Sequence, residues 1–562
     1  MVKMSRLGIL YVIVLLGGVL TGNTQNCQVR GWVKALDSGE PLIGATVYSP
    51  TETQGVYSNS DGYFLLPLSC EGGIAVIQQL GFIPDTVHIP VGTRDTFVTI
   101  SMRTQMLQTV VVTTSRVADL PGKISVPVEK LKAMPALLGE MDIFRSLQRL
   151  PGISNAVEGT TGLVVRGGAI DQNLILLDGS TLYNNGHVFG FISAINPAVV
   201  KHVDVYTGYI PAKYAGRLSS VVDIHTKDGD KTKRKREVSL GSINSSCTLE
   251  GAMGQSGRNS YLVSTRMAHS GLLTLATLPR YARGNALLFA GMYDVNAKLS
   301  WEGDHANKLS LSVYAGDDFW GATSKAQSQV STSILTWGNK AVSLRYVRPK
   351  GHKAWVTTLL GYNRYGNRLK SIGVVRSEDL PESRSEFASK GRIEEYRLHH
   401  IYQWTFGTGR TLALGAEAIR QVFLPASVRI QAGREDVLRL RPVIDTWTGG
   451  IFVNHALPLG RDLTFHTDLR LSAYVSRSLY LPWLEPRLSV NYQLSDHRKI
   501  FAAYSRTRQP LHLVTFNGNT YPYATGCPPL RHNGPKQREY LIWATKNNVE
   551  FGGSRWRLFT NR

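Results

Sequence analysis

The sequence contains no long apolar segment beyond its first 20 residues. Residues 21–562 hold no run of about 18 uninterrupted apolar residues, the length that a membrane-spanning helix requires. The one pronounced apolar stretch, Leu7–Leu20, follows a short basic start and has the length of a signal-peptide core. We therefore expect residues 1–24 to be an export signal. An exported chain without helical spans can still cross a membrane as a closed β-barrel.

Cysteine is also scarce, with four in 562 residues. Cys27 and Cys70 both fall in the first folded unit and could pair in an oxidising compartment, whereas Cys247 and Cys527 are isolated. The sequence leaves open whether any bridge forms. A lipoprotein is an alternative reading of Cys27, but the residues before it, Thr24-Gln25-Asn26, lack the small residue expected beside a lipidated cysteine.

Catalytic and metal-binding patterns are missing as well. The sequence has no Gly-x-Ser-x-Gly, no Gly-x-x-x-x-Gly-Lys and no zinc-ligand spacing. None of its 14 histidines has a glutamate at the third position after it, the spacing on which a zinc carboxypeptidase would rely. We expect no enzyme activity, no cofactor and no metal site.

Acidic residues are few relative to basic ones, 41 against 63, so the formal net charge is +22. In a cytoplasmic protein this excess would suggest nucleic acid. The export signal argues against a nucleic-acid partner and favours contact with an anionic outer leaflet or a lumen that attracts anionic ligands. The basic run Lys231–Arg236 is interpreted as a solvated turn before the first strand of a barrel.

Residues 26–103 contain short β-prone runs separated by turns. The runs are 29–33, 39–47, 57–65 and 98–100. Asp61-Gly62 predicts a hairpin, because such a turn needs residues that tolerate positive φ. The pattern resembles the carboxypeptidase regulatory-like domain, a small sandwich of the transthyretin or immunoglobulin kind. Since the zinc pattern is missing, we expect an accessory module.

Glycine-punctuated short strands form an ordered series further along the chain. The series consists of Pro151–Ile153, Gly162–Gly168, Leu174–Gly179, Phe189–Ser193, Val203–Gly208 and Ala212–Ile224. A single Asp-Gly pair would only mark a turn. The complete series resembles the plug domain of TonB-dependent outer-membrane receptors, and with the first unit it resembles the Bacteroidetes type of this family. The resemblance implies an α+β plug over residues 119–228, location in the outer membrane, and TonB with its inner-membrane energising complex as partner.

The segment 104–118 connects these two units. Its β-branched residues occupy the place where the family keeps its TonB box, and the resemblance assigns TonB binding to Thr109, Val110, Val111, Val112 and Thr113. Such a segment can add as a strand to a partner's sheet edge, with main-chain hydrogen bonds supplying the affinity. Alternatively, this segment could form the last strand of the sandwich. Val98–Ile100 is the other candidate for that strand.

From about Glu237 onward the sequence alternates between apolar and polar residues. In Leu463–Tyr474, for example, one face is apolar, and the other carries His466, Asp468 and Arg470. Charges at every second position suit a hydrated lumen, while the apolar face meets lipid. We count about fourteen strands, twice the number in a soluble sandwich. The predicted fold is mainly β: a sandwich at 26–103, an α+β plug, and a partial transmembrane antiparallel β-barrel at 229–562.

Fourteen strands are too few to enclose the plug. A plug of about 110 residues has an outer radius of about 17 Å. Fourteen strands tilted by about 40° give a barrel radius of about 14 Å. The resemblance implies 22 strands, so we expect the barrel to be truncated, and we expect that these 562 residues do not transport by themselves.

The resemblance implies an importer energised by TonB, in which apical plug loops meet the ligand. Candidate ligand-binding residues in those loops are Asn155, Glu158, Tyr183, Asn184, Asn185 and His187, and a structural role for each is the alternative. The second function class is a surface-exposed binding protein or adhesin without transport, which would need neither the TonB segment nor the plug. The ligand (siderophore, glycan fragment, peptide or cobalamin) stays open, as does a SusD-like lipoprotein partner.

Overall fold

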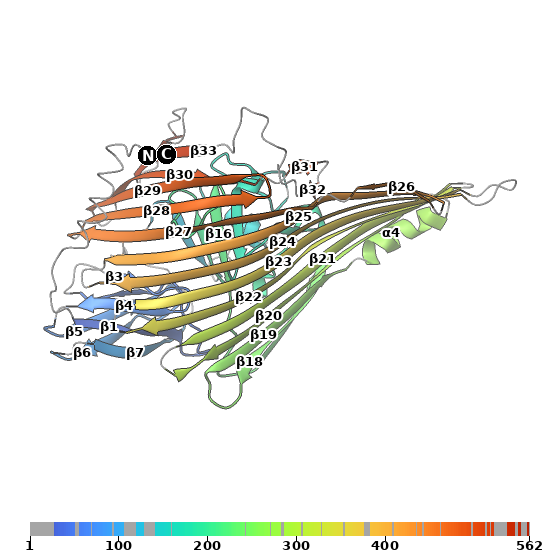
Figure 1. The fold of residues 1–562 in the computed structure, drawn as a ribbon. Coiled ribbons are helices and arrows are strands. Elements are labelled where there is room, and N and C mark those ends of the chain that lie inside the picture. The colour runs from blue at the N-terminus through green and yellow to red at the C-terminus, as the bar shows by residue number, and fades with distance from the viewer. Residues whose placement is uncertain are drawn as a thin grey trace.

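The structure, a computed structural model, contains three units. They are a first domain (residues 27–105), a central domain (residues 120–230) and a large sheet that follows (Figure 1). The predicted export signal and the predicted TonB segment 109–113 lie outside the described residues. The structure describes residues 27–50, 55–68, 70–92, 95–105, 120–128, 141–158, 160–241, 243–269, 271–282, 286–304, 307–326, 329–351, 354–375, 383–406, 410–433, 435–440, 443–460, 462–495, 498–511, 514–516, 519–521, 537–545, 549–551 and 559–560.

The first domain is the predicted β-sandwich. One sheet has the order β4-β1-β7 and the other β3-β2-β5-β6. Inward side chains such as Val33, Phe64 and Ile77 form the core between the sheets, because alternate strand residues point to opposite faces. The strands are β1 (Cys27–Ala35), β2 (Thr46–Tyr48), β3 (Gly55–Tyr57), β4 (Tyr63–Leu68), β5 (Gly73–Gln78), β6 (Asp85–Ile89) and β7 (Asp95–Met102).

The turn at Asp61-Gly62 is present, but the hairpin prediction is wrong. β3 and β4, which flank the turn, belong to different sheets. Gly62 has φ 78°, and the Asn59 side chain accepts hydrogen bonds from the backbone N–H groups of Asp61 and Tyr63 at 2.9 and 3.0 Å. The turn therefore carries the chain from one sheet to the other and holds Asp61 at the rim of the sandwich.

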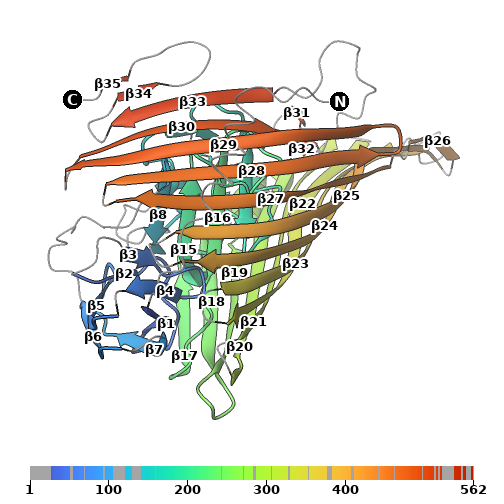
Figure 2. The same ribbon diagram turned by 60° about the vertical axis from the view of Figure 1, so that its left-hand side comes forward.

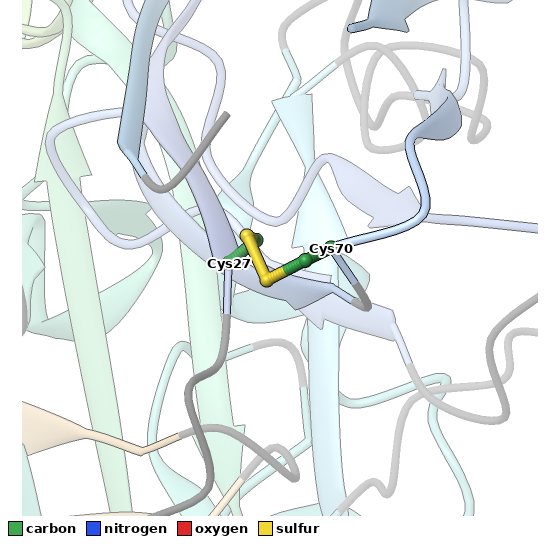
Figure 3. Close-up of a disulfide and its surroundings, with 2 residues drawn as sticks. All are labelled: Cys27 and Cys70. Carbon is green, nitrogen blue, oxygen red and sulfur yellow. A yellow bond between two sulfur atoms is a disulfide. The ribbon is translucent and has the colours of Figure 1, made fainter. Parts of the chain in front are cut away.

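Cys27 and Cys70 are joined by a disulfide (Figure 3). The bond links the start of β1 to the segment that follows β4, and it closes a sequence separation of 43 residues. The sequence had left this pairing open. Cys247, in contrast, is a free thiol.

The central domain is built on a five-stranded sheet of order β12-β11-β16-β15-β8. Helix α3 (Ile143–Leu147) packs on this sheet, and Asp142 caps its N-terminus by accepting a hydrogen bond from the Arg145 N–H. Two short hairpins, β9–β10 and β13–β14, complete the domain. The elements are β8 (Lys123–Pro127), β9 (Ile153–Asn155), β10 (Leu163–Val165), η1 (Ile170–Gln172), β11 (Asn173–Leu177), β12 (Ser180–Thr181), β13 (Gly186–His187), η2 (Val188–Gly190), β14 (Ile192–Ser193), η3 (Pro197–Val199), β15 (Val200–Tyr206) and β16 (Ser220–Thr226).

The large sheet is antiparallel and follows chain order through 17 strands, of which β17 to β30 make up the first fourteen. Within the described strands β17 and β35 do not pair with each other, so the sheet stays open there. Its elements are β17 (Lys235–Leu240), β18 (Asn244–Met253), β19 (Asn259–Ala268), α4 (Gly271–Ala282), β20 (Ala286–Glu302), β21 (Lys308–Ala326), β22 (Gln329–Lys350), β23 (Ala354–Val375), β24 (Ser383–Thr405), β25 (Thr411–Ala432), β26 (Glu435–Leu440), β27 (Ile444–Leu459), β28 (Leu463–Ser476), β29 (Tyr480–Ser495), β30 (Arg498–Arg508), β33 (Gln537–Thr545), β34 (Val549–Phe551) and β35 (Phe559–Thr560), beside a separate hairpin of β31 (Val514–Phe516) and β32 (Asn519–Tyr521).

The sheet curves around the central domain, and the first domain, drawn in blue, lies at one end of its strands (Figures 1 and 2). The alternation predicted for β28 is confirmed, since Leu471 is half exposed on the outer face while Arg470 points inward. The expectation of a hydrated lumen is wrong at this place. Asp468 and Arg470 are 3% and 1% exposed because the central domain covers them.

The interpretation of Lys231–Arg236 as a solvated turn holds for residues 233–236, which are exposed. It is wrong for Lys231, whose buried ammonium group forms an ion pair with Glu302. Lys231 contacts Glu302 of β20 and Ser38 of the first domain, and the composition of the run does not predict these contacts.

Removing the disulfide should destabilise the first domain strongly. In the chain-entropy description, a loop of this length contributes about 4 kcal/mol by restricting the unfolded chain. We expect the double variant Cys27→Ser, Cys70→Ser of residues 27–105 to lose about 2–4 kcal/mol of unfolding free energy in urea titrations. An equal free energy of unfolding for variant and parent would contradict this.

Candidate functional site

Two arginines on the inner face of the large sheet hold the loop that follows β15. Arg487 Nη1 donates to the carbonyl oxygens of Ile210 and Pro211 at 2.6 and 2.8 Å. Arg470 Nη1 donates to the Ala212 carbonyl oxygen at 3.1 Å. This loop belongs to the glycine-punctuated series, so the series serves to seat the central domain against the sheet.

The charges of these arginines are neutralised within the sheet. Arg470 Nη2 lies 2.7 Å from Glu417 Oε2, and Arg487 Nη2 lies 3.2 Å from Glu485 Oε2. All four side chains are buried. A buried charge that loses its partner is strongly destabilising, so the contacts between sheet and central domain depend on these pairs. The sequence analysis missed both arginines as functional residues, since their spacing matches any inward-facing strand position.

Tyr183 is also hydrogen-bonded to the large sheet. Its hydroxyl donates to Glu395 in a short hydrogen bond and accepts from Gln421 Nε2 at 2.7 Å. The following residue, Asn184, accepts at its carbonyl oxygen from Asn339 Nδ2 at 2.8 Å. These contacts give Tyr183 a structural role in this structure.

His187 lies in a buried polar site between the central domain and β21. Its Nδ1 is 2.6 Å from Asp318 Oδ2, and the neighbouring Val188 N–H donates to Asp318 Oδ1 at 2.7 Å. Nε2 of the ring lies 3.6 Å from Asp294 Oδ2. Burial alone would lower the pKa of His187, but the two carboxylates outweigh it and hold the pKa above its ordinary value.

The two loops predicted to meet ligand are joined to each other. Asn185 Nδ2 donates to the carbonyl oxygen of Thr161 at 2.9 Å, and the Thr161 N–H donates to the Gly190 carbonyl at 2.8 Å. Asn155 and Glu158, on the other loop, are exposed. Ligand contact stays a prediction for all six candidates, and the exposed surface favours Asn155 and Glu158 over the half-buried Tyr183 and the buried His187.

The sequence did not indicate one further surface of the plug apex, the end of the central domain formed by these two loops. Val188 and Phe189 both have positive φ, 50° and 57°, an unusual backbone for a β-branched residue. This conformation turns the Phe189 ring toward Trp320 and Trp337, with centroids 6.0 and 4.9 Å away. Phe189 remains 45% exposed. Strained backbone that presents an exposed ring beside inward aromatics is a further candidate contact surface for a ligand.

Within the described ranges, no group of three or more His, Cys, Asp or Glu side chains is arranged to hold a metal ion. Of the helices that the structure describes, none has the length and apolarity needed to cross a membrane.

Comparison with known proteins shows which domain families the first two units match. Residues 29–112 match the CarboxypepD_reg-like domain, and residues 116–221 match the TonB-dependent Receptor Plug Domain. The TonB-dependent receptor SusC of Bacteroides thetaiotaomicron is 29% identical over 238 residues, which cover 39% of this chain and 23% of that protein.

Solved structures with a similar fold include two outer-membrane receptors. The ferripyoverdine receptor of the outer membrane of Pseudomonas aeruginosa has a TM-score of 0.54 at 14% identity, with 77% of this chain and 62% of that chain covered. The siderophore receptor PirA from Acinetobacter baumannii has a TM-score of 0.51 at 14% identity, with 75% and 68% covered. The chain therefore spans less than two thirds of the length of SusC and of the ferripyoverdine receptor. At these identities the structures show a shared fold.

The chain thus carries the modules of a TonB-dependent receptor of the Bacteroidetes type. The central domain matches the plug, and the large sheet has the fold of the barrels in these receptor structures. The two predicted modules, the predicted fold class and the outer-membrane location are confirmed.

Asp318 should be required to hold the plug apex. Replacing it with alanine removes the acceptor of the Val188 N–H and the partner of His187, and we expect the free energy of local opening of residues 186–190 to fall by about 3 kcal/mol. Hydrogen exchange of these amides measures the effect. Asp317 is the matched control, because its carboxylate accepts from the exposed Tyr293 hydroxyl instead. Equal exchange in Asp318→Ala and Asp317→Ala would show that the apex is held elsewhere.

The same apex should be pH-sensitive. A raised pKa means that the stabilising pair of protonated His187 with its carboxylates is complete below the ordinary histidine pKa and is lost as pH rises through the folded value. We expect the protection factors of residues 186–190 to decrease from acidic to alkaline pH, and to become nearly pH-independent in His187→Gln. Protection that increases with pH would contradict this sign.

Proposed function

We propose that this chain, with the modules of a TonB-dependent receptor of the Bacteroidetes type, acts as part of an outer-membrane receptor that imports a ligand when TonB rearranges the plug. The observation that carries the proposal is the plug itself, which lies inside the curved sheet and is fastened to it by polar contacts such as those of Arg470 and Arg487. Hydrogen bonds such as those from Arg470 and Arg487 can exchange with water once the loops move. Such contacts suit a closure that opens and re-forms.

The proposed TonB-binding strand, residues 109–113, is tethered on both sides. Before it, the Gln105 N–H donates to the Gly81 carbonyl oxygen of the first domain at 2.9 Å. After it, the Tyr209 N–H donates to the Pro121 carbonyl oxygen, which fixes the entry to the plug. A pull on this segment therefore acts on the first domain and on the plug together.

The plug receives this pull at its edge strand. β8 pairs with β15 alone, because it is the last strand in the sheet order. Asp204 of β15 secures it through Lys123, whose ammonium nitrogen lies 3.3 Å away, and through a hydrogen bond from the Ser125 hydroxyl. An edge strand can be peeled away residue by residue, so we infer that the force of TonB enters the plug at β8.

In this proposal the ligand binds at the plug apex, in contact with Asn155, Glu158 and the Phe189 surface. A SusD-like lipoprotein partner likewise stays a proposal, supported by the similarity to SusC. A gene for such a lipoprotein beside this one would strengthen it, and iron-regulated neighbours would favour a siderophore instead.

Proline at Val111 should weaken TonB binding. Proline removes one main-chain donor and fixes φ, so it interrupts the strand ladder with which TonB would engage. We expect Val111→Pro to weaken binding of the purified periplasmic domain of TonB to this chain at least about tenfold, a change of about 1.4 kcal/mol. Isothermal titration measures the affinity directly.

Val111→Thr is the matched control, because threonine keeps both the β-branched shape and the backbone N–H. It should bind TonB as the parent does. The proposal fails if Val111→Pro binds equally well, or if ligand uptake by a receptor carrying this substitution is unchanged.

A further inference from the structure

The first domain is seated on the periplasmic end of both other units. Lys34 Nζ lies 2.7 Å from Glu302 Oε2 at the β20–β21 turn. The Lys231 N–H donates to the Ser38 carbonyl oxygen at 2.8 Å, and the Asp228 N–H donates to Glu40 Oε1 at 3.1 Å. The contacts thus reach the barrel sheet and the segment that joins plug to barrel.

The centre of this contact is a cluster of buried charges drawn from three units. Asp61 of the first domain lies 3.0 Å from Arg345 Nη2 and 3.5 Å from Lys308 Nζ. Lys308 Nζ also lies 2.6 Å from Asp228 Oδ2, at the end of the plug. Lys308 is therefore shared by the first domain and the plug connection.

Electrostatics keep Asp61 charged at this place. Burial alone would raise the pKa of Asp61, but the charges of Arg345 and Lys308 outweigh it and hold the pKa below its ordinary value. Beside the cluster, the ring of Tyr63 meets the ring of Trp355 edge-on at a centroid distance of 5.7 Å. The interface therefore has an apolar contact as well as its ion pairs.

Behind this interface lies a cavity of about 670 Å³. Its floor is formed by first-domain residues 43–44 and 57–61, and its wall by the inner face of strands β20 to β25, β27 and β28. Its roof is the face of the plug sheet that carries His202, Asp204 and Asp223 beside the apolar Leu176. The alternate residues of the same strands, such as Val203 and Val222, form the apolar plug core on the other side. A space of this size is within the range of small-ligand sites, about 300–1,000 Å³.

We propose that the first domain is an exit gate for this cavity: docked as it is here, it closes the cavity toward the periplasm, and it must release before a ligand leaves. The gating role rests on the proposed import function, whereas the closure itself does not. Because the proposed TonB-binding segment begins four positions after Gln105, the pull that opens the plug also draws on the gate. Lys308 connects the opening of the plug with the release of the first domain. When Asp228 moves away, Lys308 loses one of its two carboxylate partners.

The closure is tested by the reactivity of a thiol inside the cavity. Ser310 lines the cavity on β21 and is buried. In the full chain, solubilised from outer membranes and carrying Cys247→Ser and Cys527→Ser, Ser310→Cys provides one thiol for a maleimide bearing a polyethylene glycol chain. Since removing one partner of a buried ion pair costs several kcal/mol, we expect Asp61→Arg to raise the labelling rate at least about tenfold.

Two companion variants separate gating from misfolding. Asp61→Arg combined with Arg345→Asp restores an opposite pair, and its labelling should return toward the parent rate. Asp85→Arg places the same charge change on β6, away from the interface, and should leave the rate unchanged. Equal labelling in the parent, Asp61→Arg and the restored pair would overturn the proposal.

The docked position is tested independently by a cross-link. A Cβ built on Gly39 lies 3.2 Å from Cβ of Lys231, close to the separation of about 3.5–4.5 Å in disulfides. We expect Gly39→Cys with Lys231→Cys to form a disulfide in the periplasm, detected as linked peptides by mass spectrometry. Gly81→Cys with Lys231→Cys, from an open side of the domain, should not link. Absence of the first cross-link would overturn the docked gate, and neither readout depends on a ligand or on TonB.

Discussion

Fully buried charges on the inner face of the barrel sheet need partners, and this need organises the structure. Strand alternation places charged residues on that face, where Arg470 and Arg487 are almost completely covered. Glu417 and Glu485 neutralise them, and the plug loop after β15 supplies carbonyl oxygens for their remaining N–H groups. If the plug were absent, these groups would have to be solvated by water. The plug and the sheet are thus complementary in polarity as well as in shape.

Polar contacts of this kind bear on the plug movement that the proposed import requires. Hydrophobic burial would hold the plug permanently, because each exposed apolar surface would cost free energy in water. The plug has an apolar core of its own, around Val203 and Val222, against which Leu262, Tyr314 and Ala341 of the sheet also pack. The loop after β15 meets the sheet through polar groups instead. Hydrogen bonds to water replace those to the sheet at a small net cost. These contacts are compatible with the plug movement proposed for import.

The same principle extends to the first domain. Its sandwich encloses an apolar core around Phe64 and Ile77, and its contact with the rest of the chain rests largely on ion pairs, centred on Asp61. Because the segment between first domain and plug is the proposed point of attachment for TonB, both polar interfaces lie on the path of one applied force. Each interface thus combines ion pairs and hydrogen bonds with a smaller apolar contact, such as that of Tyr63 with Trp355.

The sequence by itself determined the local structure, because strand alternation, turn residues and glycine spacing act over a few neighbouring positions. It indicated the sandwich strands, the plug series and the inward and outward faces of strands such as β28. What only the tertiary structure decided are contacts between residues far apart in the chain. Tyr183 and His187 read as ligand-facing loop residues, yet Glu395 and Asp318 on distant strands bury them. Asp61 read as a hairpin residue, yet it pairs with Arg345, 284 positions away. Such partners depend on how the sheet curves around the plug, and no local pattern encodes that curvature.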